Sequence, residues 1–144
     1  MPDGTNKMVL IVEDDVDYRN SLSSYLSAHG LDVAVAEDGG QAMEKLLFHM
    51  PGLVILDLML PKVPGLEVLK RIREYPEASV AEIPVVVLSN FSEPEKIEEA
   101  KRFNCASYLI KSQNNNEEIL AVVQEKLFKG ETPPNYGIMD FTKE

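Results

Sequence analysis

Residues 9–15 read VLIVEDD, a largely β-branched apolar run that ends abruptly in three carboxylates. Four further short apolar runs follow along the chain, and they too are mostly β-branched with little polar alternation. Strands that are buried on both faces of a sheet have this composition. We therefore predict five buried strands, at residues 8–12, 33–36, 53–56, 85–88 and 108–110.

The segments between these runs have helical spacing, as in Tyr18, Leu22, Tyr25 and Leu26. Strand and helix thus alternate along the chain, which is typical of an α/β fold with a parallel sheet. Right-handed crossovers place helices on both faces of such a sheet, and ligands bind outside the carboxyl ends of its strands. The functional residues are therefore expected at those strand ends.

The bulk composition indicates one acidic domain. The chain has 144 residues and a formal net charge of -10, which disfavours direct binding to nucleic acid or to an anionic membrane. We expect a cytoplasmic protein, because the longest apolar runs are far shorter than a membrane span. Cys105 is the only cysteine, so no intrachain disulfide can form. The pattern predicts a domain at residues 7–128 and a tail at 129–144 that is flexible or docks.

Polar residues replace apolar ones where four of the predicted strands end. Glu13 and Asp14 follow the first strand, Asp57 the third, Ser89 the fourth and Lys111 the fifth. Taken singly, each acid could be a loop residue or a helix cap. Taken together, carboxylates converging on one pocket repel each other unless cations lie among them. Oxygen ligands with open positions favour Mg²⁺, and Lys111 supplies a second positive charge.

Four motifs in this order resemble the response-regulator receiver family: VLIVEDD at 9–15, VILDLMLPKVPGLEVL at 54–69, IPVVVLSN at 83–90 and SYLIK at 107–111. The resemblance covers about residues 7–128. It implies a doubly wound, flavodoxin-like fold with five parallel strands in the order 2-1-3-4-5.

The resemblance also implies a role for each strand-end residue. Phosphorylation would use Asp57 as acceptor, assisted by Lys111 and Ser89, while Ser89 and Tyr108 would form the switch pair. The metal would be Mg²⁺, held by Asp14, Asp57 and the backbone carbonyl of Met59, with Glu13 acting mainly through water.

The implied activity is a signalling switch that catalyses only its own phosphorylation and dephosphorylation. Its partners would be a histidine kinase or a phosphotransfer protein, and then a downstream protein or a second copy. The output surface would be the face of the fourth helix, fifth strand and fifth helix. We expect it to include Lys96, Glu99, Lys101, Tyr108 and exposed positions of the helix at 117–128. Ile138, Met139 and Phe141 of the tail could fold back on the domain or dock on a partner.

Three positions depart from the family pattern. Ser112 replaces a proline whose preceding peptide bond is usually cis, and without proline a cis bond costs about 2.5–4 kcal/mol. We therefore expect a trans Lys111–Ser112 bond. Met59 offers no hydrogen bond to an attacking water, and Asn90 is bulkier than the residue often found there, which predicts slow hydrolysis of the phosphorylated state.

Three other functions compete with this interpretation. A phosphatase of the haloacid-dehalogenase type would need a second Asp where Met59 stands. A flavodoxin-like FMN carrier would need a loop that binds phosphate, but residues 13–15 are all acidic and would repel it. A pseudoreceiver that works without phosphorylation is disfavoured, because the acid pair, acceptor, hydroxyl and lysine are all present.

Overall fold

The computed structural model describes residues 6–128 and 138–140. Five parallel strands form the sheet in the order β2-β1-β3-β4-β5. This confirms the predicted doubly wound fold. The strands are β1 (Met8–Val12), β2 (Asp32–Ala36), β3 (Leu53–Leu56), β4 (Val85–Ser89) and β5 (Ser107–Ile110).

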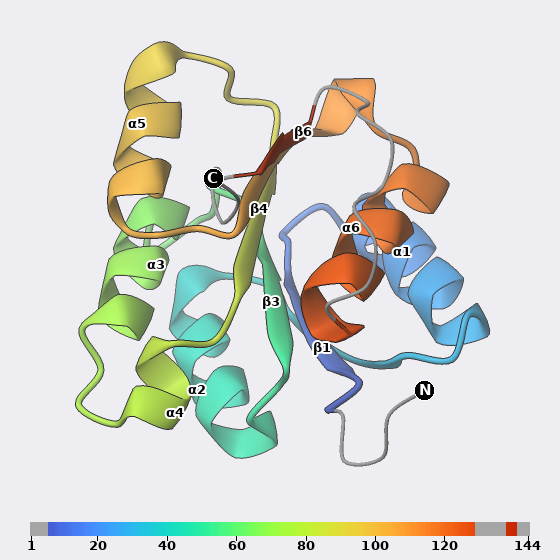
Figure 1. Ribbon diagram of the computed structural model, residues 1–144, viewed down its shortest axis with the longest axis horizontal. Coiled ribbons are helices and arrows are strands. Elements are labelled where there is room, and N and C mark those ends of the chain that lie inside the picture. Colours follow the sequence, from blue (N-terminus) through green and yellow to red (C-terminus); the bar gives the residue numbers. More distant parts are fainter. Residues whose placement is uncertain (1–5, 129–137, 141–144) are drawn as a thin grey trace.

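Helices cover both faces of the sheet (Figure 1). On one face lie α1 (Val16–Ala28) and α6 (Asn116–Phe128). On the other lie α2 (Gly39–His49), α3 (Gly65–Arg73), the short α4 (Ala78–Ala81) and α5 (Pro94–Arg102). Because α4 is an extra turn, the fourth and fifth helices of the predicted output face are α5 and α6.

The core lies in two layers because side chains alternate along each buried strand. Leu10 and Val12 belong to the apolar cluster under α2, α3 and α5, whereas Val9 and Ile11 belong to the cluster under α1 and α6. All four are almost fully buried. The prediction of buried strands is therefore confirmed for β1, β3, β4 and β5, whereas β2 lies at the edge of the sheet and only its last residue, Ala36, is buried. The sheet supports the loops at its carboxyl end.

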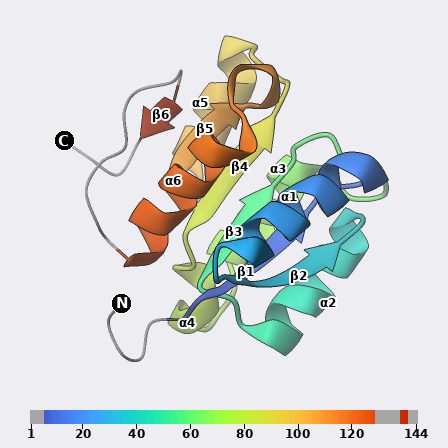
Figure 2. The same ribbon diagram turned by 90° about the vertical axis from the view of Figure 1, so that its right-hand side faces the viewer.

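One strand was not predicted. Strand β6 (Ile138–Asp140) pairs antiparallel with β5 and adds a sixth strand at the edge of the sheet (Figure 2). Only the backbone of this strand is described. Phe141 lies outside the described residues, as do residues 129–137.

Gly65 brings the start of α3 against the end of β3. A β-carbon at this position would overlap the backbone of Asp57 and Leu58, so a larger residue would push the two segments apart. The Gly65 amide also donates to the Leu58 carbonyl at 3.1 Å. The loop after β3 is therefore held tightly where it carries Asp57.

Candidate functional site

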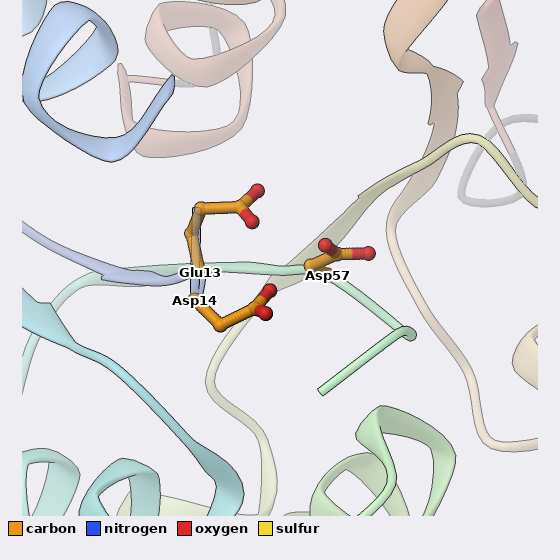
Figure 3. Close-up of side chains that lie close together, drawn as sticks. All are labelled: Glu13, Asp14 and Asp57. Atoms are coloured by element: carbon orange, nitrogen blue, oxygen red, sulfur yellow. The ribbon is translucent and has the colours of Figure 1, made fainter. Parts of the chain in front are cut away.

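The three acidic side chains that were predicted to converge do so at the carboxyl end of the sheet (Figure 3). Strands β1 and β3 are neighbours, with Val12 opposite Leu56, so the residues that follow them lie side by side. One carboxylate oxygen from each of Glu13, Asp14 and Asp57 lies within 4.8 Å of the others. Glu13 and Asp57 are buried, whereas Asp14 is exposed.

Lys111 joins the cluster from the turn that follows β5. Its Nζ lies 2.5 Å from Oε1 of Glu13 and 3.0 Å from Oδ2 of Asp57. Burial opposes the charge on Lys111, but the hydrogen bonds to the two carboxylates outweigh it and raise its pKa. The ammonium group therefore stays charged and offsets part of the negative charge.

Lys111 does not offset all the negative charge of the three carboxylates. Burial raises the pKa of Glu13 to about 7, even though the hydrogen bond from Lys111 acts in the opposite direction. Three carboxylates face one ammonium group, which leaves room for a further positive charge. The donors are hard oxygens and Asp14 opens to solvent, so the residues fit a hydrated divalent cation better than a closed zinc site.

The predicted hydroxyl and aromatic residue lie on neighbouring strands, since Ser89 is the last residue of β4 and Tyr108 lies on β5. Ser89 is buried, and its Oγ accepts a hydrogen bond from the Phe91 amide at 3.3 Å. Tyr108 is fully buried, and its hydroxyl donates to the Phe91 carbonyl at 2.6 Å. Burial raises the pKa of Tyr108 to about 12, so the phenol keeps its proton.

Tyr108 belongs to a strand that was predicted to be buried, and its burial confirms that prediction. It was also expected to belong to the output surface, and its ring packs in the core under α5. Strand β5 is flanked on both sides by other strands in the described structure, so its side chains point only to the faces that helices cover. Tyr108 reaches the loop after β4 through its hydrogen bond to the Phe91 carbonyl.

A model of the response regulator receiver domain matches residues 9–124. The chain belongs to this family. The matched residues include Glu13, Asp14, Asp57, Ser89 and Lys111. Receivers are signalling domains of two-component systems.

Named relatives agree with this assignment. The chain is 41% identical over 69 residues to the alkaline phosphatase synthesis transcriptional regulatory protein PhoP of Bacillus subtilis, covering 48% of this chain and 29% of that protein. It is 35% identical over 106 residues to the transcriptional regulatory protein PdtaR of Mycobacterium tuberculosis, covering 73% and 49%. The chain thus spans less than half the length of these curated relatives.

A solved receiver gives the same fold over nearly its full length. The chemotaxis response regulator CheY4 of Vibrio cholerae superposes with a TM-score of 0.76 at 29% identity, covering 85% of this chain and 100% of that one. A neighbour that was solved with a divalent metal is the Mn²⁺-bound form of the response regulator Rcp1, with a TM-score of 0.73 at 27% identity and coverage of 90% and 99%.

The loop after Asp57 in this receiver is held by the Asp57 side chain. The Met59 amide donates to Oδ1 of Asp57 at 3.1 Å, and the Met59 side chain is exposed. The Lys111–Ser112 bond is trans, and the structure has no cis peptide in its described part, which confirms that prediction.

Sequence reasoning did not find Tyr18. Its ring centroid lies 4.5 Å from Nζ of Lys111, which is a cation–π contact. Burial raises the pKa of Tyr18 to about 12. The signal in the sequence is its place in the first turn of the helix that follows the acid pair, where a side chain can lean over the end of the sheet.

Among its described residues, the receiver has no helix that is both long enough and apolar enough to cross a membrane.

Proposed function

We propose that this chain is a phospho-accepting receiver in which Asp57 takes a phosphoryl group from a histidine kinase or a histidine phosphotransfer protein. The observation that supports this most is the bridge from Lys111 to both Glu13 and Asp57, with the exposed Asp14 beside it. A carboxylate and a phosphoryl group are both negatively charged and repel each other. Here the Lys111 ammonium group lies against the carboxylate and offsets part of that repulsion.

In the proposed transfer, an oxygen of Asp57 forms a bond to phosphorus while the bond from phosphorus to the donor imidazole nitrogen breaks. The imidazole then takes a proton from solvent. Lys111, whose Nζ contacts Oδ2 of Asp57, would also contact the oxygens of the incoming phosphoryl group. Ser89 would turn its hydroxyl toward the new phosphoryl group, giving up the Phe91 amide that it binds here.

The proposed metal is Mg²⁺, held by Asp14, Asp57 and the backbone carbonyl of Met59, with Glu13 acting through water. When bound, it supplies positive charge against the oxygens of the transferring group. The buried position of Glu13 and its contact with Lys111 support an indirect role, because its Oε1 is already engaged. Asp14 is exposed and therefore free to enter the coordination shell of a hydrated ion.

The signal would leave through the face of α5, β5 and α6. This face adjoins the loop at Phe91, whose backbone is hydrogen-bonded to both Ser89 and Tyr108. Phosphorylation would move Ser89, and Phe91 would transmit the change because both residues bind its backbone. The target would be a protein or a second copy of the chain. Direct nucleic-acid binding is not proposed for this segment, given its net charge of -10.

The test is intact mass spectrometry after incubation with acetyl phosphate and Mg²⁺. We expect one added phosphoryl group on the native chain and none on Asp57→Asn. A matched control is Asp38→Asn, because Asp38 is also a buried aspartate but caps α2 outside the site, and asparagine caps a helix as well. An unmodified native chain would favour a pseudoreceiver, and equal labelling of Asp57→Asn would place the acceptor elsewhere.

A further inference from the structure

Two departures from the receiver pattern, Asn90 and Ser112, are joined in the structure by one hydrogen bond. The Ser112 amide donates to Oδ1 of Asn90 at 3.0 Å. A proline at position 112 would have no amide hydrogen to donate. One departure therefore supplies a donor and the other supplies its acceptor, so the two residues act as a pair.

The hydrogen bond between the two residues gives an acceptor to a backbone amide next to Lys111. Residues Lys111–Gln113 form a single 3₁₀ turn, and the first amides of such a turn have no acceptor within it. The residue that precedes the turn is Ile110, whose side chain has no oxygen and makes no capping hydrogen bond. Asn90 supplies the missing oxygen from the neighbouring strand's loop.

The other side of the turn is also fastened. The buried Asn114 donates from Nδ2 to the Ile110 carbonyl at 2.9 Å. Lys111 thus sits between two asparagine contacts, one from the loop after β4 and one from the residue that ends the turn. Its ammonium group must reach both Glu13 and Asp57, so the position of this turn decides where Nζ lies.

Asn90 also lies next to the switch hydroxyl. Ser89 pairs with Ile110 at the last position of the β4 and β5 ladder, and the contact from Asn90 to Ser112 extends that pairing beyond the sheet. The end of β4, which carries Ser89, and the turn that carries Lys111 are therefore joined through Asn90.

We propose that Asn90 is a positioning residue for Lys111, acting through the Ser112 amide in the place of the family's cis proline. This inference rests on the proposed phosphorylation of Asp57, which gives the lysine its task. It assigns Asn90 no contact with the phosphoryl group. Its carboxamide oxygen fixes the position of the turn, and the turn sets where the Lys111 ammonium group lies relative to Asp57.

The test compares four substitutions that separate the acceptor oxygen from side-chain bulk. Asn90→Ala removes both, Asn90→Leu keeps the bulk without the oxygen, and Asn90→Asp keeps both. Ser92→Ala is the control in the same exposed loop. The readouts are the rate constant of phosphorylation by acetyl phosphate, the Mg²⁺ affinity, and the NMR signals of the Ser112 amide and Lys111 Nζ.

We expect Asn90→Ala and Asn90→Leu to slow phosphorylation about fivefold, the effect of losing roughly one hydrogen bond of about 1 kcal/mol. Both should shift the Ser112 and Lys111 signals while the Mg²⁺ affinity stays unchanged. Asn90→Asp should restore most of the rate, and Ser92→Ala should match the native chain. A general structural loss would instead change the Mg²⁺ affinity and the rate together.

Two results would overturn this inference. One is a Lys111 Nζ signal that does not shift in Asn90→Leu. The other is a phosphorylation rate that depends on the size of the side chain and not on its oxygen, so that Asn90→Leu matches the native chain and Asn90→Ala does not. Failure of the native chain to be phosphorylated would overturn the proposed function instead. In that case the Ser112 and Lys111 signals still decide whether Asn90 holds the lysine.

Discussion

The charge balance of the site leads to a prediction for Lys111→Met, which keeps the length of the side chain and removes its charge. Nζ of Lys111 contacts Glu13 at 2.5 Å and Asp57 at 3.0 Å, and both partner side chains are almost fully buried. Removing one member of a buried ion pair leaves an uncompensated charge and costs about 3–5 kcal/mol. We expect the free energy of unfolding to fall by about 3 kcal/mol near pH 8 without metal, the lower end because Lys111 keeps some access to water.

The fall in the free energy of unfolding caused by Lys111→Met should become smaller as the pH falls. The pKa of Glu13 in the folded native chain is raised by burial from 4.5 to about 7, against the effect of Lys111, and removing Lys111 raises it further. The folded state then binds more protons than the unfolded state above 4.5, so its stability falls as the pH rises through that window. Below it, a neutral Glu13 has no need of a cationic partner.

The assay is urea denaturation followed by circular dichroism, since the chain has no tryptophan. Added Mg²⁺ should reduce the difference in the free energy of unfolding between Lys111→Met and the native chain, because it restores positive charge and binds only the folded state. The matched control is Lys62→Met: Lys62 contacts Asp38 at 3.3 Å, but its side chain is 73% exposed, so the loss should be below about 1 kcal/mol. The reasoning is refuted if Lys111→Met costs no more than Lys62→Met, or if its cost grows toward acidic pH.

The same site supports three more predictions. Asp14→Ala should weaken Mg²⁺ binding more than Glu13→Ala, since Asp14 is proposed as a direct ligand, and equal losses in a calorimetric titration would contradict the assignment. Mg²⁺ binding near pH 6 should release a proton from Glu13, whose pKa is about 7, and the heat should depend on the buffer; Glu13→Gln should abolish that dependence. Met59→Asn should speed hydrolysis of the phosphorylated state several-fold by offering a hydrogen bond to the attacking water, with an unchanged lifetime counting against a role for Met59.

Most of the fold could be predicted because buried parallel strands leave a strong signal. Runs such as residues 9–12 are apolar on both faces, so neither helix nor exposed strand explains them as well. Strand β6 could not be predicted in the same way. It has three residues and pairs with an edge, and its pairing depends on backbone groups of β5 that the sequence does not display.

The convergence of the acids and the lysine could also be predicted, because strand ends of a parallel sheet meet at one edge. The contacts of Tyr18 and Asn90 could not. Each depends on which way one side chain turns from a loop or a first helical turn, and that choice is made by neighbours far away in the sequence.

Strand β6 changes what a binding partner finds at this side of the molecule. Without it, β5 would present a row of free amides and carbonyls, to which another chain could add a strand. Antiparallel pairing of Ser107 with Asp140 and of Leu109 with Ile138 occupies that row. A protein that recognises the α5, β5 and α6 face must therefore read side chains of the two helices, or compete with the receiver's own tail for the backbone of β5. Among the described strands, the remaining open edge is β2, which lies at the opposite side of the sheet and begins with the charged Asp32.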